Sequence, residues 1–516
     1  MSISFKKQTI GQASILIATF TILSQALGLI RESLVANYLG TSADYDILLV
    51  ALAIPAMIGT ILMMSLPAAG IPSLQSNSSG QGVGSNIFRS RFFMINLIMG
   101  LILAAIAFFC LPILGGLLAT GLDEARVQLA IKYGGYFCLL IPLRSLEAVF
   151  QSFLHVRYHF VLPAISTIGF NLVIIGLLVG LFPSLGSQAY IIATIAGILL
   201  EMVMVAVPTY FIYRRSGPLI DNSGFQMSGY IRFLGIIVLI DGLGLLVDPF
   251  DRYLAGIFLP PGYISANYYA NLVGHIPIRI FVMSLGMAIF PSLSEVAAKK
   301  NMFELARLYH KAVAICIMLV IPVAVYSIIF KNEIISFLFE RGQFNELSRA
   351  MTVAILPYYL AGMIFSSLYF IQSRVLYSLK SWTNLLWARI VSLAAKVAIG
   401  VLLIKTNWAL AIGGGTLAMF VVLYLIIEHY LIKKNALYYL KSDLKLVTKS
   451  GLIAVGVVLS ILLAEILSTK LLGLRPILAA VATAGIGTLC LMISDGIFDV
   501  SGFNLKKYIK KRKLNF

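Results

Sequence analysis

The chain has 516 residues, of which 60% are hydrophobic and only 12% are charged. A soluble protein of this length would be neither so apolar nor so poor in charge, so the composition indicates a polytopic membrane protein. The formal net charge is +18. The basic residues are spread over short loops between apolar segments rather than gathered on one face, which argues against a nucleic-acid-binding protein.

Runs of about 20 apolar residues are typical of transmembrane helices. The sequence contains about fourteen such runs, and the predicted fold class is therefore an all-α polytopic membrane protein. The predicted spans are 9–35, 46–71, 91–115, 128–154, 161–183, 188–213, 230–258, 265–296, 309–330, 350–372, 384–404, 408–432, 450–470 and 475–497.

Lys and Arg accumulate in alternate loops, as in Arg214 and Arg215 and in the tail KKYIKKRK at 506–513. The positive-inside rule then predicts that both termini are cytoplasmic. The basic tail is either a topology anchor or a binding site for a partner or for anionic lipid. No signal peptide is evident, because the first apolar run is longer than a signal sequence requires.

An internal repeat is visible in the sequence. SADYDILLVALAIP at 42–55 parallels ISANYYANLVGHIP at 264–277, and IPSLQS at 71–76 parallels FPSLSE at 290–295. The repeat predicts one six-helix unit used twice in the same orientation, with a substrate site at the interface between the two lobes. Two further helices follow the repeat. The predicted organisation is an N-lobe at 1–222, a C-lobe at 223–445, and two extra helices with the basic tail at 446–516.

No catalytic motif is present in the sequence. A P-loop, a nucleophile elbow and a His-rich metal signature are all missing, and the loops are too short for a soluble catalytic domain. We therefore expect a transporter rather than an enzyme, without a metal or a cofactor. Its energy would come from an ion gradient or from the membrane potential acting on charges.

Charged residues inside apolar spans are the candidate functional residues, because a charge near the bilayer centre is costly and usually faces a water-filled interior. Arginine in such a place favours a phosphate or diphosphate ligand, whereas a cation exporter would favour acidic residues. The balance of acids and arginines does not decide between them. Structural ion pairs and snorkelling remain alternatives for each residue. The set comprises Arg31, Glu32, Asp46, Arg144, Glu147, Asp241, Asp248, Asp251, Arg252, His275 and Arg279.

Pro55 and Pro277 hold matching positions in the two repeats. A proline inside a helix removes a hydrogen bond and permits a kink. Two matched bending points suit an alternating-access machine, although static kinks fit the sequence equally well.

Several motifs, taken in order, resemble one known family, the MurJ/MviN lipid II flippases within the group of multidrug, oligosaccharidyl-lipid and polysaccharide exporters. The resemblance covers nearly the whole chain. The motifs are LGLIRESLVANYLGTSADYD (27–46), LLVDPFDRYLAGIFLPPGYISANYYANL (245–272), FPSLSE (290–295), FERGQF (339–344) and SRVLYSLKSWTN (373–384).

The resemblance implies a flippase that moves undecaprenyl-diphosphate-linked peptidoglycan precursor, lipid II, from the inner to the outer leaflet of the bacterial cytoplasmic membrane by alternating access. It also implies two six-helix lobes around a cationic cavity, with the last two helices forming a groove for the lipid tail. Arg31 and Asp46 match an arginine and an aspartate of the family's first hairpin.

From this we expect Arg31 to contact the diphosphate and Asp46 to pair with an arginine during gating. Three arginines of the family fall on Gln25, near Gly59 and on Asn271 in this chain. We expect other residues to compensate for them. The expected substrate-binding residues are Arg31, Arg144, Asn271 and Arg279; the expected ion-pair residues are Glu32, Asp46, Asp251 and Arg252; and the expected hinges are Pro55 and Pro277.

Three alternatives remain open at this point. The cargo could be another lipid-linked glycan, such as an exopolysaccharide or O-antigen unit. The chain could instead be a cation-coupled exporter of the multidrug type, or a membrane scaffold that recruits wall-synthesis enzymes through its basic tail. The expected partners are a lipid-linked oligosaccharide, membrane lipids and cell-wall synthesis proteins.

Overall fold

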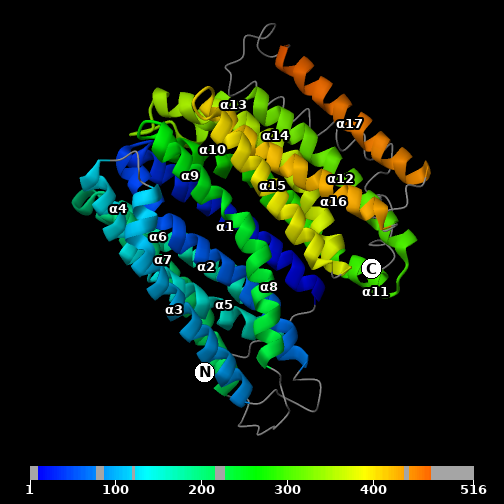
Figure 1. The fold of residues 1–516 in the computed structure, drawn as a ribbon, viewed down its shortest axis with the longest axis horizontal. Coiled ribbons are helices and arrows are strands. Elements are labelled where there is room, and N and C mark those ends of the chain that lie inside the picture. The colour runs from blue at the N-terminus through cyan, green and yellow to red at the C-terminus, as the bar shows by residue number, and fades with distance from the viewer. Residues whose placement is uncertain are drawn as a thin grey trace, which may run out of the picture. The chain divides into compact units, whose positions relative to one another are not determined.

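The computed structural model describes residues 10–76, 86–118, 123–157, 159–214, 227–379, 381–434 and 441–466. Every regular element within these ranges is helical, which confirms the all-α prediction (Figure 1). The first nine helices are α1 (Ile10–Leu39), α2 (Ala43–Ser76), α3 (Asn86–Leu118), α4 (Glu124–Phe137), α5 (Leu140–Val156), α6 (Val161–Leu185), α7 (Gln188–Arg214), α8 (Met227–Leu245) and α9 (Val247–Phe258).

The later helices include two short π-helical turns, η1 and η2. They are α10 (Tyr263–Pro277), η1 (Ile278–Val282), α11 (Met283–Ala298), α12 (Met302–Ile329), α13 (Lys331–Phe339), α14 (Glu346–Ser378), α15 (Trp382–Leu403), η2 (Leu410–Gly414), α16 (Gly415–Lys433) and α17 (Lys441–Ile466).

Ten helical segments of the described residues are long and apolar enough to cross a membrane. They match ten of the fourteen predicted spans. The predicted spans 9–35, 265–296 and 450–470 are helical over α1, over α10 to α11 and over most of α17, but they are not among the ten. The predicted span 475–497 and the basic tail lie outside the described residues, so the count of fourteen is not confirmed.

The chain forms two compact units. One unit comprises residues 1–265 together with the short segment 338–348, and the other comprises residues 266–337 and 349–516. Helices α8 and α9 therefore pack with the first unit, although the sequence repeat places them in its second copy. The division into lobes at 222 and 445 follows the repeat and remains a prediction from the sequence.

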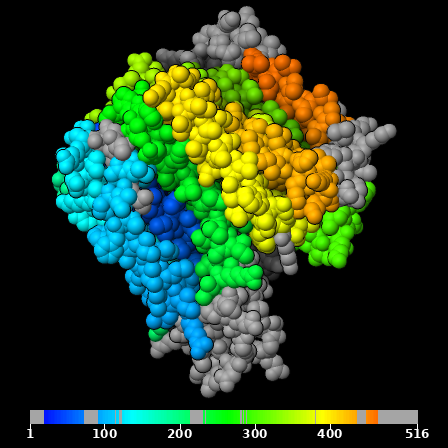
Figure 2. All heavy atoms as spheres, in the orientation of Figure 1, coloured from blue at the N-terminus to red at the C-terminus, as the bar shows by residue number. Residues whose placement is uncertain are grey.

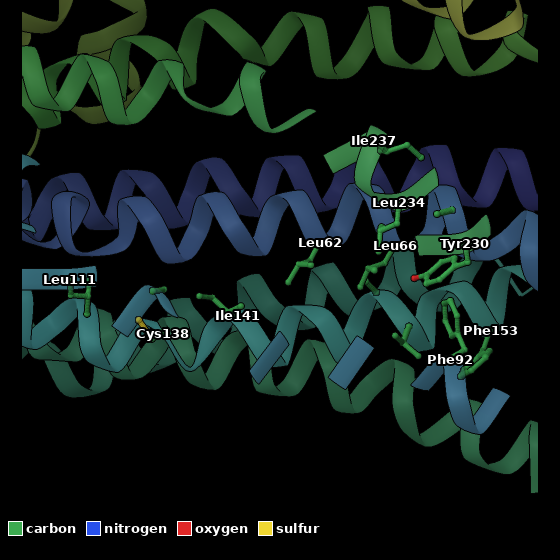
Figure 3. Packing of buried hydrophobic residues seen from close by; sticks show 14 residues of the cluster. Leu62, Leu66, Phe92, Leu111, Cys138, Ile141, Phe153, Tyr230, Leu234 and Ile237 are labelled. Atoms are coloured by element: carbon green, nitrogen blue, oxygen red, sulfur yellow. The ribbon is translucent and has the colours of Figure 1, made fainter. Parts of the chain in front are cut away.

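The core of the first unit joins α8 to α2, α3 and α5 (Figure 3). Tyr230 of α8 is buried beside Phe92 of α3, with ring centroids 5.3 Å apart. The Tyr230 hydroxyl donates to Asn96 Oδ1 over 2.9 Å, and the Ser145 hydroxyl of α5 donates to the Asn96 carbonyl over 2.7 Å. A polar group in an apolar core is costly unless it is hydrogen-bonded, so these bonds fix the relative positions of the three helices.

The segment 338–348 lies against the end of α1 in the first unit. Ser33 donates to the Leu338 carbonyl over 2.6 Å, and the Gln343 amide donates to the Asn37 carbonyl over 2.9 Å. Gly342 has a φ of +57°, and a Cβ built on it would collide with Asn37. Glycine is required here both for the left-handed backbone and for the close approach of segment 338–348 to the end of α1. The segment contains the motif FERGQF.

In the second unit, α12 packs on α17, and α15 packs on α16. Figure 2 shows the outer side chains of α15 and α16 at the molecular surface. Many of these are large and apolar, with exposed fractions of 61% for Trp387, 74% for Leu402 and 56% for Leu425. Exposed apolar side chains along membrane-length helices are what a lipid environment favours, because lipid tails are as apolar as these residues.

Candidate functional site

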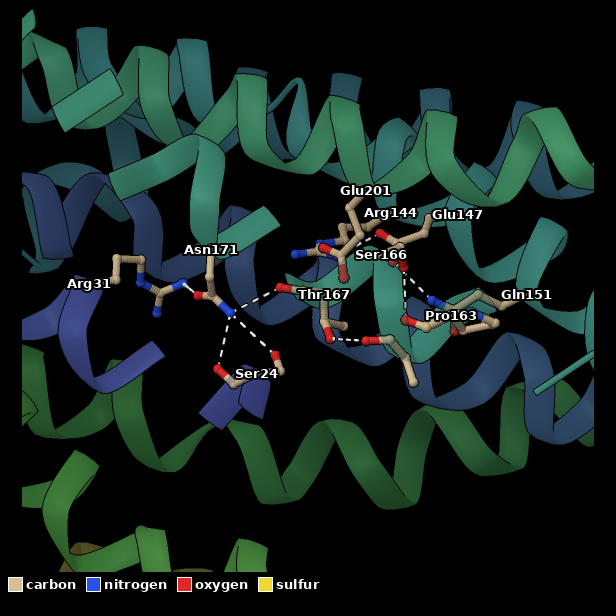
Figure 4. Close-up of polar contacts among 11 residues, drawn as sticks. Ser24, Arg31, Arg144, Glu147, Gln151, Pro163, Ser166, Thr167, Asn171 and Glu201 are labelled. Carbon is tan, nitrogen blue, oxygen red and sulfur yellow. Dashed lines mark hydrogen bonds and ion pairs between the residues drawn. The ribbon is translucent and has the colours of Figure 1, made fainter. Parts of the chain in front are cut away.

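Arg31 lies in α1 and binds two side chains of the first unit. Its Nε and Nη2 donate to Glu32 Oε1 over 3.1 and 2.6 Å. Its Nη1 donates to Asn171 Oδ1 of α6 over 3.1 Å. Asn171 in turn donates to the Ser24 carbonyl and hydroxyl of α1 (Figure 4). Arg31 is therefore held in one orientation by α1 and α6 together.

Arg144 lies in α5 and binds two carboxylates. Its Nη1 is 2.5 Å from Glu147 Oε2 and 2.8 Å from Glu201 Oε2 of α7. Gln151, one turn beyond Glu147, donates to the other Glu147 oxygen over 2.9 Å. The sequence spacing of three residues between Arg144 and Glu147 predicts the first pair correctly, whereas the second pair joins two helices that are distant in the sequence.

The ring of Phe170 in α6 lies below both guanidinium groups. The guanidinium carbon is 5.3 Å from the ring centroid for Arg31 and 5.5 Å for Arg144. Aromatic rings attract cations at this distance. The structure thus brings together two of the predicted cationic residues.

Burial differs between the two signs of charge at this site. About a fifth of each arginine side chain is exposed, at 20% for Arg31 and 19% for Arg144, while Glu32, Glu147 and Glu201 are exposed by 2%, 0% and 4%. The carboxylates therefore lie behind the guanidinium groups and hold them in place. We call the set of Arg31, Arg144, Phe170 and these three acids the arginine cluster.

Gly59 of α2 lies beside the arginine cluster. A Cβ built on Gly59 would be 3.2 Å from Arg144 Cγ and 3.5 Å from Arg144 Cβ. The sequence resemblance places a family arginine near this position. Here the missing side chain leaves room for Arg144, and the compensation for the lost arginine remains a prediction.

Asp46 of α2 is fully buried and accepts hydrogen bonds from the start of α10. Its Oδ2 accepts from the Gly262 amide over 2.5 Å and its Oδ1 from the Ser265 amide over 2.8 Å. A carboxylate is stabilised there because the first amides of a helix lack intrahelical partners. Gly262 has a φ of +98°, which favours glycine at the turn. Backbone amides are the hydrogen-bond partners of Asp46 in this structure, and the expected pairing with an arginine during gating remains a prediction.

Arg252 and Asp251 lie in α9. Arg252 donates to the backbone carbonyl of Leu49 in α2, so it joins two helices of the first unit. Asp251 is buried, with 1% exposure. Of the two other acids predicted near this region, Asp248 is exposed and Asp241 is half-buried.

The remaining predicted residues belong to the second unit. Asn271 is half-buried, and its carbonyl bonds His275 Nδ1 over 2.9 Å. Arg279 is exposed and lies in η1, immediately after Pro277 ends α10. Pro55, the matching residue, lies within the continuous helix α2. The two matched prolines therefore have different local structures.

Sequence reasoning missed several residues that the structure brings to notice. Glu201 and Lys396 are each a charged residue inside an apolar run, so the same search for intramembrane charges would have found them. Asn171 and Phe170 carry no such signal, because an uncharged side chain in an apolar helix is ordinary. Within the described residues, no group of three or more histidine, cysteine, aspartate or glutamate side chains could hold a metal ion.

Comparisons with known proteins agree with this architecture. The family model of the lipid II flippase MurJ matches residues 35–505. The probable lipid II flippase MurJ of Aquifex aeolicus is 27% identical over 384 residues, covering 72% of each chain. The corresponding protein of Buchnera aphidicola subsp. Baizongia pistaciae is 26% identical over 436 residues, covering 79% of this chain and 81% of its own.

Solved structures share the fold. A lipid II flippase MurJ in an inward closed conformation has a TM-score of 0.77 at 20% identity, covering 94% of this chain and 98% of its own. An inward-facing multidrug resistance transporter of the MATE family has a TM-score of 0.60 at 13% identity, covering 81% of this chain and 97% of its own. The family model spans most of the sequence, including Asp46 of α2 and the members of the arginine cluster in α5, α6 and α7. The chain therefore belongs to the lipid II flippase MurJ family.

Proposed function

We propose that this chain is a flippase that carries lipid II across the bacterial cytoplasmic membrane, from the inner to the outer leaflet, with the arginine cluster as the contact for the diphosphate. The observation that carries this proposal is the partial exposure of Arg31 and Arg144 above one shared ring, with three acids buried behind them. Membership of the family supports the cargo, and its activity is transport rather than catalysis.

The chemistry of the cluster suits a diphosphate. A guanidinium fork matches the oxygens of a phosphate and stays charged when it is partly desolvated. Contact with the same ring places both guanidinium groups in one part of the first unit. The buried acids keep both arginines in the required orientation, and preorganised groups lose less entropy when a ligand binds.

Alternating access requires that the closed contacts of one state open in another. In the first unit, the Asp46 carboxylate caps α10, and the segment 338–348 binds the end of α1. We propose that these contacts, which all lie within the first unit, open during the transport cycle. With both termini in the cytoplasm, as the distribution of Lys and Arg indicates, the turn between α1 and α2 lies on the outer side.

The membrane potential is a sufficient driving force for an anionic lipid. A potential that is negative inside favours outward movement of negative charge by about 2.3 kcal/mol per elementary charge per 100 mV. The diphosphate of lipid II is negatively charged, so the potential drives its movement past the arginine cluster in the required direction. No bound nucleotide is needed for this step.

Complementation tests the proposal. The chain is expressed in a bacterium depleted of its own lipid II flippase, and survival is scored together with membrane insertion. We expect wild type to rescue growth and Arg31→Ala to abolish the rescue. Arg126→Ala is the matched control, because Arg126 is an exposed arginine of the same unit that pairs with Asp123 at a helix start. A well-inserted wild type that fails to rescue would contradict lipid II as the cargo and favour another lipid-linked glycan.

Arg279 requires a separate test, because it lies in the second unit, eight positions after Asn271. We assign it to the cationic surface that compensates for the arginine missing at Asn271. Arg279→Ala should weaken rescue at low expression. Unchanged rescue at every expression level would remove Arg279 from the site and leave the arginine cluster in place.

A further inference from the structure

Lys396 is a fully buried cation in the second unit. It lies in the second half of α15, and its exposed fraction is 0%. Its ammonium nitrogen donates to the Thr416 hydroxyl over 2.7 Å and to the Ile412 carbonyl over 3.2 Å. Both acceptors are neutral. A buried ammonium costs several kcal/mol unless it is well compensated, so this residue differs from a lysine that extends to the membrane surface.

The acceptors of Lys396 lie at an irregular part of the backbone. Ile412 belongs to η2, and Thr416 follows one turn later in α16. The Thr416 hydroxyl also donates to the Ile412 carbonyl over 3.1 Å. A π-turn shifts carbonyl groups away from the regular helical pattern. Transporters use carbonyls at irregular helix segments, with hydroxyl oxygens, to coordinate small cations inside the membrane.

Gly413 of η2 packs closely against α14. A Cβ built on Gly413 would be 2.8 Å from Ile355 Cγ1, which is too close for a side chain without a shift. A Cβ built on Gly415 would make ordinary contacts with α15, 3.7 Å from Lys396 Cγ and 3.5 Å from the Lys396 carbonyl. The backbone of η2 is thus packed tightly against α14, and its carbonyl oxygens lie close to α15 and the ammonium.

We propose that Lys396 is a tethered cation that fills a small-cation position formed by the Ile412 carbonyl and the Thr416 hydroxyl. The ammonium replaces an alkali cation between α15 and α16. The second unit therefore keeps its packing without binding Na⁺ or K⁺. The consequence for transport, which rests on the proposed function, is that lipid translocation by this chain does not depend on an alkali cation at this position.

Thermal unfolding of the purified full chain tests the proposal without any lipid II, so its outcome is independent of the cargo. The unfolding midpoint of wild type is measured in NaCl, KCl and choline chloride at equal ionic strength. We expect the three midpoints to agree. A saturable rise of the wild-type midpoint in Na⁺ or K⁺ relative to choline, abolished by Thr416→Val, would overturn the proposal.

Substitution of Lys396 provides a second test of the proposal. Lys396→Asn shortens the side chain and leaves space beside the two oxygens, so we expect its midpoint to rise with Na⁺ or K⁺ in a saturable manner, as for any ligand that binds the folded state. Lys396→Met is the matched control, because its longer apolar side chain fills the space. A cation response in Lys396→Asn no larger than in Lys396→Met would contradict the proposal.

The double variant Lys396→Asn with Thr416→Val identifies the site. Loss of the hydroxyl should abolish the gained cation response. A response that persists in the double variant would place the cation elsewhere and overturn the assignment. If Lys396→Asn does not fold in choline but folds in Na⁺ or K⁺, the tethered role is supported; failure to fold in all three salts would contradict it.

Discussion

In the first unit, Arg31 and Arg144 each expose about a fifth of the side chain and lie in front of buried carboxylates. In the second unit, Lys396 is fully buried and donates to neutral oxygens. A partly exposed cation with a fixed orientation can bind an anion that comes from solution. A fully buried cation that donates to neighbouring oxygens can contact only the residues around it. We propose that this difference in exposure separates a residue that contacts substrate from one that contacts only its own unit, although both are charges inside apolar helices.

The largest expected effect in this comparison follows from Arg144→Ala. It leaves Glu147 and Glu201 buried without their shared cation, which destabilises a protein by about 3–5 kcal/mol. We expect a lower yield of folded protein and a lower unfolding midpoint. The triple variant Arg144→Ala, Glu147→Gln, Glu201→Gln is the control, since removing the charges together should restore stability but not transport. Equal stability of Arg144→Ala and wild type would contradict the buried-pair geometry.

Asp46→Asn has the next largest expected effect. The amide nitrogen of Asn cannot accept a hydrogen bond, so either the Gly262 or the Ser265 amide loses its partner, at a cost of about 1–3 kcal/mol. We expect faster hydrogen exchange at residues 262–265 and altered transport. Asp44→Asn is the control, because Asp44 is an exposed acid in the same turn of α2. Unchanged exchange at 262–265 would contradict the cap.

Gly59→Ala probes the room that α2 leaves for Arg144. The added methyl would meet Arg144 Cγ at 3.2 Å, so Arg144 must shift, and overpacking of this kind costs about 1 kcal/mol or more. Gly176→Ala of α6 is the control, because its Cβ would meet nothing within 4 Å. The gain in helix propensity is the same in both variants, so the difference between their unfolding midpoints measures the contact. Equal midpoints would mean that Arg144 does not use this space.

Lys396→Met has the smallest expected effect. Replacement of buried ion pairs by apolar side chains of similar volume is often neutral because it removes the cost of desolvating the charges. Lys396→Met removes the same kind of cost, and the Thr416 hydroxyl retains its bond to the Ile412 carbonyl. We expect stability within about 1 kcal/mol of wild type and little change in lipid II transport. A loss of transport as severe as that expected for Arg31→Ala would place Lys396 in the substrate path and remove the distinction between the two units.

The sequence predicted the helical class, ten of the spans and the candidate arginines, because length, hydropathy and intramembrane charge are local signals. It could not predict that Arg31 and Arg144 share the ring of Phe170, since that contact depends on the packing of three helices. The matched prolines show the same limit. Pro55 lies within the continuous helix α2, but Pro277 ends α10 and precedes η1, where the Met283 amide bonds the Ile278 carbonyl. The choice between these outcomes depends on the surrounding helices rather than on the proline.

The hydrogen-bond partners of Asp46 also could be identified only from the structure. The sequence marked it as a buried charge and suggested an arginine as its partner. In this structure backbone amides at the start of α10 bind its carboxylate, and no sequence pattern identifies a tertiary helix cap from residues more than 200 positions away. Intramembrane charge therefore predicts that a residue has a partner, but it does not predict which one.

The most direct test of the central claim measures lipid II translocation in proteoliposomes that contain the purified chain. We expect wild type to accelerate translocation and Arg31→Ala to reduce the rate by about tenfold to a hundredfold, as expected for the loss of a charge-assisted hydrogen bond of about 1.5–3 kcal/mol. Arg126→Ala should retain the wild-type rate. A folded Arg31→Ala protein that translocates lipid II as fast as wild type would contradict the assignment of the arginine cluster to the diphosphate.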